Sequence, residues 1–389
     1  MPPPGFAVEA PYDAPMDDSR VVTPPFLAGP LRLLPFRGLM LTASRIGDPA
    51  SARAFARPYR DVAQRLQQWE RRGHVHHDDA PAVYLHEYTS GGITIRGLVG
   101  SLDLSHRATR ASERVIFPHE GVHPVQADEL ADRMAEMRMN PAPILLVHRG
   151  PEAIRPLLRA VMTTEPAQQY TDRAEQRHRI WAIRDRHTLS AIDDALAGSR
   201  AMIADGHHRY AAYLRLQHEH PGGPNDLGLA MLVDQDDTPL FMGAIHRVLA
   251  GTSLADLEVA ARATGAGFSP LAPTEAVAAL GPSTLVATDG TNWAGIDLEV
   301  PRRRAVVELV HDRLIPALPR PPRRIDFHHA VEDALAHVSP EIGAALLLPA
   351  PEFDLVLRIV AAGRLLPEKA TSFQPKPSVG VLIRSLRDE

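Results

Sequence analysis

A segment in the middle of the chain combines residue types that bind anions. Asp205-Gly-His-His-Arg209 directly follows the apolar residues 201–204. We expect a buried strand that ends at Asp205 and a helix that begins after Gly206, with Asp205 as the N-cap of that helix. The N–H groups in the first turn of a helix and the positive end of its dipole attract anions, and a glycine allows close approach of the backbone.

Basic side chains in this first turn favour a ligand. Cations are unfavourable at the N-terminal end of a helix dipole, so His207, His208 and Arg209 need a compensating anion. The alternative is a glycine turn with two hydrogen-bonded histidines that merely begins a helix, and for an isolated Gly-His-His it would be the better interpretation. In a strand–turn–helix context we instead predict that Gly206, His207, His208 and Arg209 bind phosphate, with Asp205 and His208 as catalytic candidates.

The composition limits the available chemistry. The 389 residues include no cysteine, which excludes a thiol nucleophile, a disulfide and a cysteine-ligated metal cluster. The net charge of −5 and the pI near 6.4 argue against a protein that holds nucleic acid through its overall field. No apolar run approaches the roughly 20 residues that a membrane-spanning helix needs. We therefore expect a cytoplasmic protein with neither a membrane nor a nucleic-acid partner.

A carboxylate upstream of the turn is a candidate general base. Glu120 follows the predicted strand 115–117, and a glutamate at a strand end can accept the proton of a bound hydroxyl. A salt bridge to one of the many arginines is an equally good interpretation. Residues 119–123 also match the zinc-protease pattern His-Glu-x-x-His, but prolines flank the pattern and a glycine interrupts it, so a regular helix and a metal site are not predicted.

Two further cations are candidates for phosphate contacts. Arg247 lies at the end of a predicted strand, where a guanidinium can bind a phosphate through two hydrogen bonds. An arginine exposed at the rim of the site is an equally good interpretation. Lysine occurs only at positions 369 and 376 in a chain that otherwise uses arginine. A compact ammonium can approach a phosphate where a planar guanidinium cannot, so we predict that Lys376 contacts the ligand, with chance retention as the alternative.

The apolar periodicity predicts a succession of helices and strands, that is, an α+β (mixed α/β) fold. One hairpin is expected from the runs 82–88 and 93–99, and a second from the runs 229–233 and 240–245 around the aspartate-rich turn 234–237. Further strands are predicted at 115–117, 143–147, 179–184 and 201–204. Helices are predicted from residue 54 to Gly73 and at 127–139, 151–162, 187–197, 207–218, 254–264, 305–315 and 353–364.

Prolines indicate where the chain divides. Residues 1–25 repeat proline without apolar periodicity, which is typical of a poorly ordered arm. Four prolines within residues 316–322 mark the clearest internal break. We therefore expect a nucleotide-binding core with insertions over residues 26–315 and a C-terminal α/β segment over residues 316–389 that packs on it.

The segment Ala204-Asp-Gly-His-His-Arg-Tyr210 resembles the signature of a prokaryotic family called domain of unknown function 1015. Other segments agree in order, namely Phe117-Pro-His-Glu120, Asn140-Pro-Ala-Pro-Ile144, Ile180-Trp181, Ile245-His-Arg-Val248 and Lys369-Ala-Thr-Ser-Phe-Gln-Pro-Lys376. The chain departs from the family at Gly121-Val122, where Arg-Thr is usual, and Asp132-Arg133 is an approximate counterpart of a family Asp-Arg pair. The resemblance spans nearly the whole chain.

The turn is also similar to that of ADP- or ATP-dependent free serine kinases, sulfiredoxins and ParB nucleotidases. This resemblance implies a ParB/sulfiredoxin-like core that holds the phosphates of ATP or ADP, bridged by Mg²⁺, and it makes Glu120 the counterpart of an early glutamate in the serine kinases. It implies a phosphotransferase that acts on a small hydroxylated acceptor such as serine. The alternative is a nucleotide-binding or nucleotide-hydrolysing regulatory protein of the ParB kind, and a homodimer is compatible with both.

Overall fold

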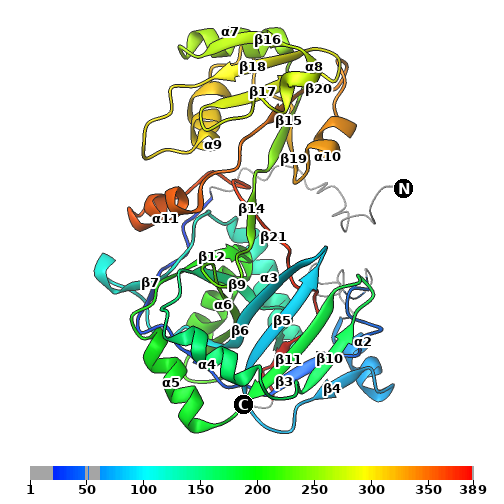
Figure 1. The fold of residues 1–389 in the computed structure, drawn as a ribbon, viewed down its shortest axis with the longest axis vertical. Coiled ribbons are helices and arrows are strands. Elements are labelled where there is room, and N and C mark those ends of the chain that lie inside the picture. Colours follow the sequence, from blue (N-terminus) through cyan, green and yellow to red (C-terminus); the bar gives the residue numbers. More distant parts are fainter. Residues whose placement is uncertain (1–20, 49–50, 52–61, 388–389) are drawn as a thin grey trace. The chain divides into compact units, whose positions relative to one another are not determined.

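Helices and strands alternate along the chain, which confirms the predicted α+β (mixed α/β) fold class (Figure 1). The computed structural model describes residues 21–48, 51 and 62–387. Contacts between residues define two units: unit 1 comprises Met1–Phe117, Val122–Pro239 and Pro375–Glu389, and unit 2 comprises Pro118–Gly121 and Leu240–Gln374. The main part of unit 2 is therefore an insertion between two parts of unit 1. Most of the predicted arm, residues 1–20, lies outside the described residues.

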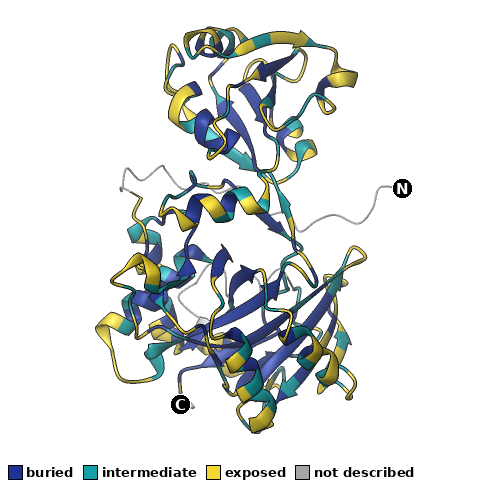
Figure 2. Ribbon diagram, turned by 60° about the vertical axis from the view of Figure 1, so that its left-hand side comes forward, coloured by how far each residue is buried: buried dark blue, intermediate teal, exposed yellow. Residues whose placement is uncertain are grey.

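Unit 1 is built on a ten-stranded mixed sheet of order β1-β7-β12-β9-β13-β6-β5-β11-β10, with β2 paired to β6. β12 runs parallel to β7 and antiparallel to β9, while β9 and β13 are parallel. These central strands are almost entirely apolar and buried, as expected where both faces of a sheet are covered (Figure 2). The strands are β1 Leu27–Ala28, β2 Leu33–Leu34, β5 Val83–Ser90, β6 Ile93–Asp103, β7 Arg114–Phe117, β9 Ile144–His148, β10 Gln168–Thr171, β11 Arg177–Ile183, β12 Ala201–Asp205 and β13 Leu227–Asp234.

Helices of unit 1 bury their apolar faces in one core with this sheet. Met134, Leu158, Leu196 and Leu214, each from a different helix, belong to the same buried cluster as the sheet residues. The helices are α2 Val62–Arg71, α3 Pro124–Met137, α4 Ile154–Val161, α5 Arg186–Leu196 and α6 His207–Glu219, with short 3-10 turns at Ala111–Glu113 and Pro224–Asp226. A second, four-stranded sheet of order β4-β3-β22-β8 joins Val75–His77, Gly38–Leu41, Ile383–Ser385 and Met139–Asn140.

The first predicted hairpin is confirmed and the second is wrong. β5 and β6 pair antiparallel around Gly91 and Gly92, both of which have positive φ. β13, in contrast, pairs with β6 and β9 on its two edges, so no edge is left for residues 240–245. β14 (Phe241–Gly243) instead pairs with β21 (Ser372–Gln374). Asp234 at the end of β13 accepts the Gly150 N–H (2.9 Å) and caps the neighbouring loop rather than closing a hairpin.

Unit 2 contains a six-stranded antiparallel sheet of order β16-β18-β17-β20-β15-β19. The expected break at residues 316–322 lies inside this unit, because β19, which follows it, pairs with β15, which precedes it. The strands are β15 His246–Ala250, β16 Gly267–Leu271, β17 Thr284–Thr288, β18 Trp293–Asp297, β19 Arg324–His328 and β20 Gly343–Leu347. The helices are α7 Leu254–Ala263, α8 Pro273–Ala276, α9 Val306–Leu309 with a π-helical turn Val310–Leu314, α10 Val331–Ala336 and α11 Phe353–Ala361.

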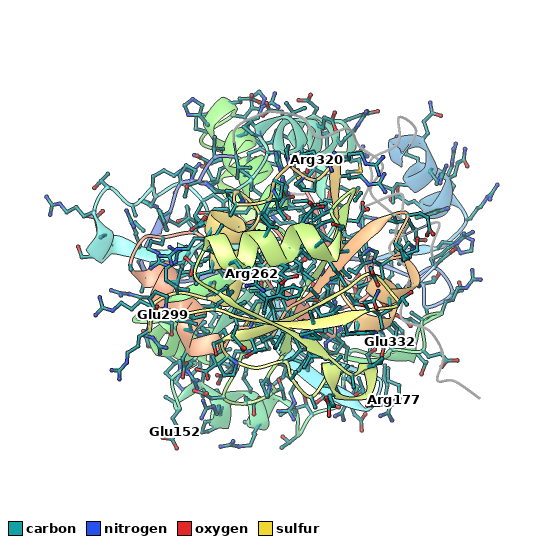
Figure 3. The ribbon with its side chains drawn as sticks, turned by 90° about the horizontal axis from the view of Figure 1, so that it is seen from above. Glu152, Arg177, Arg262, Glu299, Arg320 and Glu332 are labelled. Carbon is teal, nitrogen blue, oxygen red and sulfur yellow. The ribbon has the colours of Figure 1, made fainter. Side chains whose placement is uncertain are left out.

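Charged side chains lie on the surfaces of both units. Glu152 and Arg177 in unit 1, and Arg262 and Arg320 in unit 2, are all exposed (Figure 3). Among the described residues, none of the helices combines the length and the apolar character that crossing a membrane requires.

Candidate functional site

The predicted strand–turn–helix is present, and Gly206 provides the turn. β12 ends at Asp205, Gly206 adopts a left-handed conformation (φ 91°, ψ 31°), and α6 begins at His207. The sequence predicted Asp205 as the N-cap of α6, but the N-cap is Gly206. No side chain caps the helix. The helical hydrogen bonds begin at Tyr210, whose N–H donates to the Gly206 carbonyl (2.8 Å), so the N–H groups of the first turn lie outside that series.

Arg209 turns back over the glycine. Its Nη2 donates to Asp205 Oδ2 (2.6 Å), and its Nη1 donates to the Pro143 carbonyl (2.5 Å). A Cβ on Gly206 would lie 2.9 Å from Arg209 Nη2. Glycine is thus needed here both for its positive φ and for the close approach of the guanidinium.

Lys376, predicted to contact the ligand, lies at the same turn. Its Nζ is 2.8 Å from Asp205 Oδ1, so the two oxygens of one carboxylate are each paired with a different cation. Burial by itself would raise the pKa of the Asp205 carboxyl, but Lys376 and Arg209 outweigh it and hold that pKa well below its ordinary value. Asp205 is thus an anion within the protein that compensates the charges of Arg209 and Lys376. One carboxylate facing two cations at a helix N-terminus leaves an excess of positive potential.

A second helix begins beside the turn. His123 is the N-cap of α3, and its N–H donates to His208 Nε2 (3.1 Å) while the two imidazoles stack with 6.1 Å between ring centroids. An accepting Nε2 requires the neutral tautomer of His208 with its proton on Nδ1. Arg215, two turns into α6, pairs with Asp128 and Asp132 of α3. The two helices therefore run parallel from a shared end, and the positive ends of two dipoles meet near His208.

His207 differs from His208 in exposure. It is 8% exposed, whereas His208 is only partly buried. Its positive charge, when present, would add to the field of Lys376 and Arg209 on the Asp205 carboxyl.

Asp132 and its neighbour Arg133 are the approximate counterpart of the family Asp-Arg pair. Asp132 pairs with Arg215, and Arg133 pairs with Glu136.

The predicted base, Glu120, belongs to unit 2. Its Oε1 accepts the Ala370 N–H (3.0 Å) and lies 3.4 Å from His119 Nε2. His119 is 1% exposed, and its Nε2 is 2.8 Å from Thr371 Oγ1. Residues 118–123 do not form a helix, so the His-Glu-x-x-His spacing yields no pair of ligands on a helical face. The carboxylate of Glu120 is instead fixed against the segment 370–371.

Arg247, predicted as a second phosphate clamp, is also in unit 2 and is completely buried. Its guanidinium donates to the carbonyls of Ile245, Glu368 and Lys369 and, through Nε, to His311 Nε2 (3.3 Å). Burial lowers the pKa of Arg247 to about 10, although the nearby carboxylates of Glu120 and Glu368 oppose this effect. Arg247 therefore fixes the backbone of residues 368–369. The next residue, Ala370, donates the N–H that holds the Glu120 carboxylate.

Several residues that contact the turn or its helix, among them Ala142, Pro143 and His123, were not predicted as site residues from the sequence. The carbonyls of Ala142 and Pro143 accept hydrogen bonds from Tyr213 and Arg209 respectively. The segment Asn140-Pro-Ala-Pro-Ile144 matched the family, and that match was the signal for its proximity to the turn. His123 had no such signal, because its role depends on α3 and α6 being neighbours in space.

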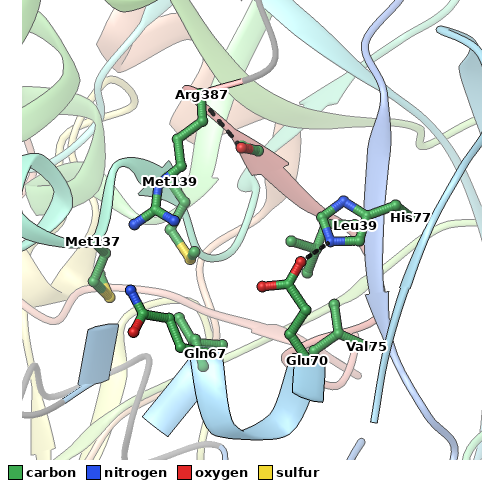
Figure 4. Close-up of a pocket in the computed structure, with 10 residues that line it drawn as sticks. Leu39, Gln67, Glu70, Val75, His77, Met137, Met139 and Arg387 are labelled. Carbon is green, nitrogen blue, oxygen red and sulfur yellow. Dashed lines mark hydrogen bonds and ion pairs between the residues drawn. The ribbon is translucent and has the colours of Figure 1, made fainter. Parts of the chain in front are cut away.

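A separate pocket of about 110 Å³ lies elsewhere in unit 1 (Figure 4). Its apolar wall includes Leu39, Leu66 and Met139, and its polar rim includes Glu70, whose carboxylate lies 3.1 Å from His77 Nε2. None of the residues from Asp205 to Arg209 lines it. The turn with its two helix ends and its cations is thus a different feature from this pocket.

The donors at the turn suit a phosphorylated ligand better than a bare metal ion. Backbone N–H groups, a guanidinium and an ammonium all donate hydrogen bonds, and anions need such donors. Asp205 could supply an oxygen ligand, but both of its oxygens are paired with cations. Mg²⁺ would therefore be held here mainly through oxygens of the ligand's own phosphates.

These features define an α+β protein with a glycine turn, flanked by two cations, between a buried strand and a helix. The chain belongs to the family described as protein of unknown function (DUF1015), whose model matches residues 35–308. This match confirms the resemblance seen in the sequence. None of the curated proteins matches the chain.

Several solved structures resemble this one. A mutant of free serine kinase in complex with ADP is 14% identical, with 74% of this chain and 92% of that chain covered and a TM-score of 0.40. A conserved hypothetical protein from Pyrococcus furiosus is 14% identical, with 74% and 95% covered and a TM-score of 0.38. SbnI with a C-terminal truncation, from Staphylococcus aureus, is 12% identical, with 75% and 90% covered and a TM-score of 0.42.

Proposed function

We propose that this protein is a nucleotide-dependent phosphotransferase that acts on a small hydroxylated acceptor, with serine as the first candidate. The observation that supports the proposal most directly is the cation pair at the N-terminus of α6, where Lys376 and Arg209 share Asp205 at 2.8 and 2.6 Å. When a phosphate enters this end of the helix, Lys376 and Arg209 can exchange their pairing with the Asp205 carboxylate for pairing with a more highly charged group. The first-turn N–H groups add donors without a reorganisation cost.

In the proposed reaction the acceptor hydroxyl oxygen attacks the terminal phosphorus of the nucleotide. A new P–O bond forms to the acceptor, the bond to the leaving phosphate breaks, and the hydroxyl proton passes to a carboxylate. Mg²⁺, bound through the phosphates, would neutralise charge that develops on their oxygens. The residues Gly206–Arg209 and Lys376 would orient the phosphates and stabilise the same charge.

Of the two carboxylates predicted as the base, Glu120 is the better candidate. The pKa of Asp205 is held low by its two cations, so it is a weak proton acceptor. Its two ion pairs suit it instead to hold Lys376 and Arg209 in place. Glu120 is 13% exposed at its side chain and is held by the Ala370 N–H, so it can be tested separately from the phosphate-binding turn.

The test is to incubate the purified protein with ATP or ADP, Mg²⁺ and serine and to follow phosphorus by ³¹P NMR. We expect phosphoserine to form at the rate at which the nucleotide is consumed. The matched control is His208→Ala, which removes the imidazole next to both helix ends and should abolish nucleotide binding measured by calorimetry. Unchanged nucleotide affinity in this variant would overturn the assignment of the turn. Nucleotide hydrolysis that no hydroxylated acceptor stimulates would favour the regulatory alternative.

A further inference from the structure

The segment that carries Lys376 has no regular secondary structure. Residues 375–378 belong to neither a strand nor a helix. An ammonium at the end of a four-carbon side chain on such a segment would lose much conformational freedom on pairing. Its position opposite Asp205 therefore requires that other groups hold its backbone.

Two side chains of unit 1 hold this backbone directly, that of Gln176, which directly precedes β11, and that of Tyr88 in β5. Gln176 Nε2 donates to the Lys376 carbonyl (2.9 Å), and the Ser378 N–H donates to Gln176 Oε1 (3.1 Å). Tyr88 donates its hydroxyl hydrogen to the Pro375 carbonyl (2.6 Å). The side-chain amide of Gln176 thus takes the place of the N–H and C=O of one residue in a parallel neighbouring strand, which bond the carbonyl of one residue and the N–H of the residue two further on.

Gln176 is itself rigidly held. It is 8% exposed, and its N–H donates to Asp172 Oδ1 (2.9 Å) across a tight turn that begins β11. The other oxygen of Asp172 lies 3.0 Å from His178 Nε2, and His178 Nδ1 lies 3.0 Å from His86 Nε2. This chain of buried polar groups leaves Gln176 little freedom, so its amide is a fixed template for residues 376–378.

We propose that Gln176, with Tyr88, is a positioning residue that holds the Lys376 backbone so that the ammonium meets Asp205 and, when a ligand is bound, its phosphate. The part of this proposal that concerns the ligand rests on the proposed function, whereas the part that concerns Lys376 and Asp205 does not. Glutamate cannot replace Gln176, because a carboxylate would face the Lys376 carbonyl without a donor. Alanine would remove both hydrogen bonds.

The two lysines allow a direct measurement. Lys369 is exposed and serves as an internal reference for Lys376, whose side chain is 35% exposed and paired with Asp205. Competitive acetylation by a soluble ester at pH 8, followed by mass spectrometry, reports how often each amine is unpaired. For Gln176→Ala we expect the acetylation of Lys376 relative to Lys369 to rise about tenfold, the change that one or two lost hydrogen bonds produce in an equilibrium.

Controls separate positioning from general damage. Gln169→Ala removes an exposed glutamine from β10, which pairs with the strand that follows Gln176, and should leave the ratio unchanged. Tyr88→Phe deletes only the hydroxyl and should raise the ratio in a protein whose near-UV circular dichroism is that of the wild type. A wild-type ratio in folded Gln176→Ala and Tyr88→Phe would overturn the proposal.

A second measurement connects positioning to the ligand. Calorimetric titration with ADP should show that Gln176→Ala and Lys376→Ala each weaken binding about tenfold, and that the double variant is little weaker than either one. Additive losses would show that Gln176 does not act through Lys376. If the wild type binds neither ADP nor ATP, the proposed function fails while the acetylation result still decides the placement of Lys376.

Discussion

Lys376 Nζ lies 2.8 Å from Asp205 Oδ1, which ties the C-terminal part of unit 1 to the end of β12. The remaining oxygen of the same carboxylate accepts from Arg209. One acidic side chain therefore sets the positions of two cations that lie far apart in the sequence.

Removal of the Lys376 ammonium should weaken nucleotide binding without unfolding the protein. We expect Lys376→Ala to raise the Kd for ADP about tenfold, because one charge-assisted contact to phosphate is lost. Lys376→Arg should recover only part of the affinity, since a planar guanidinium cannot take the place of a compact ammonium. Calorimetry gives the Kd, and Lys369→Ala is the control for loss of a lysine. Equal effects of the two alanine variants would contradict a specific role for Lys376.

Substitution of Gly206 by alanine should destabilise the protein for two separable reasons. The positive φ and the 2.9 Å contact of a Cβ with Arg209 together should cost about 2 kcal/mol in the free energy of unfolding. Gly222 also has a positive φ (80°), but a Cβ there meets nothing within 4 Å, so Gly222→Ala measures the cost of φ alone. Urea denaturation should show a larger loss for Gly206→Ala, and the extra loss should vanish when Arg209→Ala is added.

The Asp205 ion pairs should make stability depend on pH in the acid range. The pKa of Asp205 is lowered in the folded state, so its contribution is complete above its unfolded pKa of about 4 and is lost as the pH falls toward the folded value. At pH 7 we expect Asp205→Asn to be less stable than the wild type by about 1 kcal/mol. This difference should shrink below pH 4 in denaturation curves. Asp194→Asn, at an exposed position, should show no such trend.

Buried histidines should destabilise unit 2 at mildly acidic pH. Burial lowers the pKa values of His246 and His311 to about 4, so the unfolded chain, with a pKa near 6.5, binds protons that the folded unit does not. Stability should therefore be complete above pH 6.5 and fall between pH 6.5 and 4, by up to about 1.4 kcal/mol per pH unit for each histidine. His311→Gln keeps a side-chain acceptor for Arg247 and cannot titrate, so its stability should depend less steeply on pH. An unchanged slope would contradict the assignment.

A substitution at Glu120 should separate turnover from binding. We expect Glu120→Gln to lower the rate of phosphoryl transfer by about 100-fold or more, the usual size of a general-base contribution, while the Kd for the nucleotide stays at the wild-type value. A radiolabelled transfer assay and calorimetry measure the two quantities. A rate within twofold of the wild type would exclude Glu120 as the base. Glu113→Gln is the control variant and should leave both quantities unchanged, because the Glu113 carboxylate accepts hydrogen bonds from its local turn, through the Thr109 and Arg110 N–H groups.

The local elements of the fold could be predicted because each depends on neighbouring residues. The strand at 201–204, the turn at Gly206 and the helix after it follow from an apolar run, a glycine and helical periodicity. The hairpin at 229–245 was wrong because the pairing of β13 is decided by β6 and β9, which are distant in the sequence. The N-cap was misassigned for a related reason: Asp205 finds stronger partners in Arg209 and Lys376 than in the helix N–H groups.

The composition of the site could be predicted only in part. Family-like segments indicated Lys376 and Asn140–Ile144, but the sequence does not reveal that Gln176 holds the Lys376 backbone, because that contact depends on how the chain folds back. Arg247 illustrates the opposite limit. A strand-end arginine looks equally suited to a ligand and to solvent, whereas its actual partners are carbonyls that become neighbours only after unit 2 has folded.

Because the main part of unit 2 is inserted into unit 1, the residues around the turn are synthesised at two separate times. β12 and α6 are synthesised before the main part of unit 2, Leu240–Gln374, whereas Pro375–Glu389 follows it. β14 and β21 pair at the two ends of the insertion, through Gly243 and Ser372, so folding of unit 2 brings the late residues back toward the point where the insertion began. A nascent or truncated chain that stops before Pro375 would keep the Asp-Gly-His-His-Arg segment but lack the ammonium opposite it. Under the proposed function, phosphate binding at the turn would therefore be complete only after the main part of unit 2 has been synthesised.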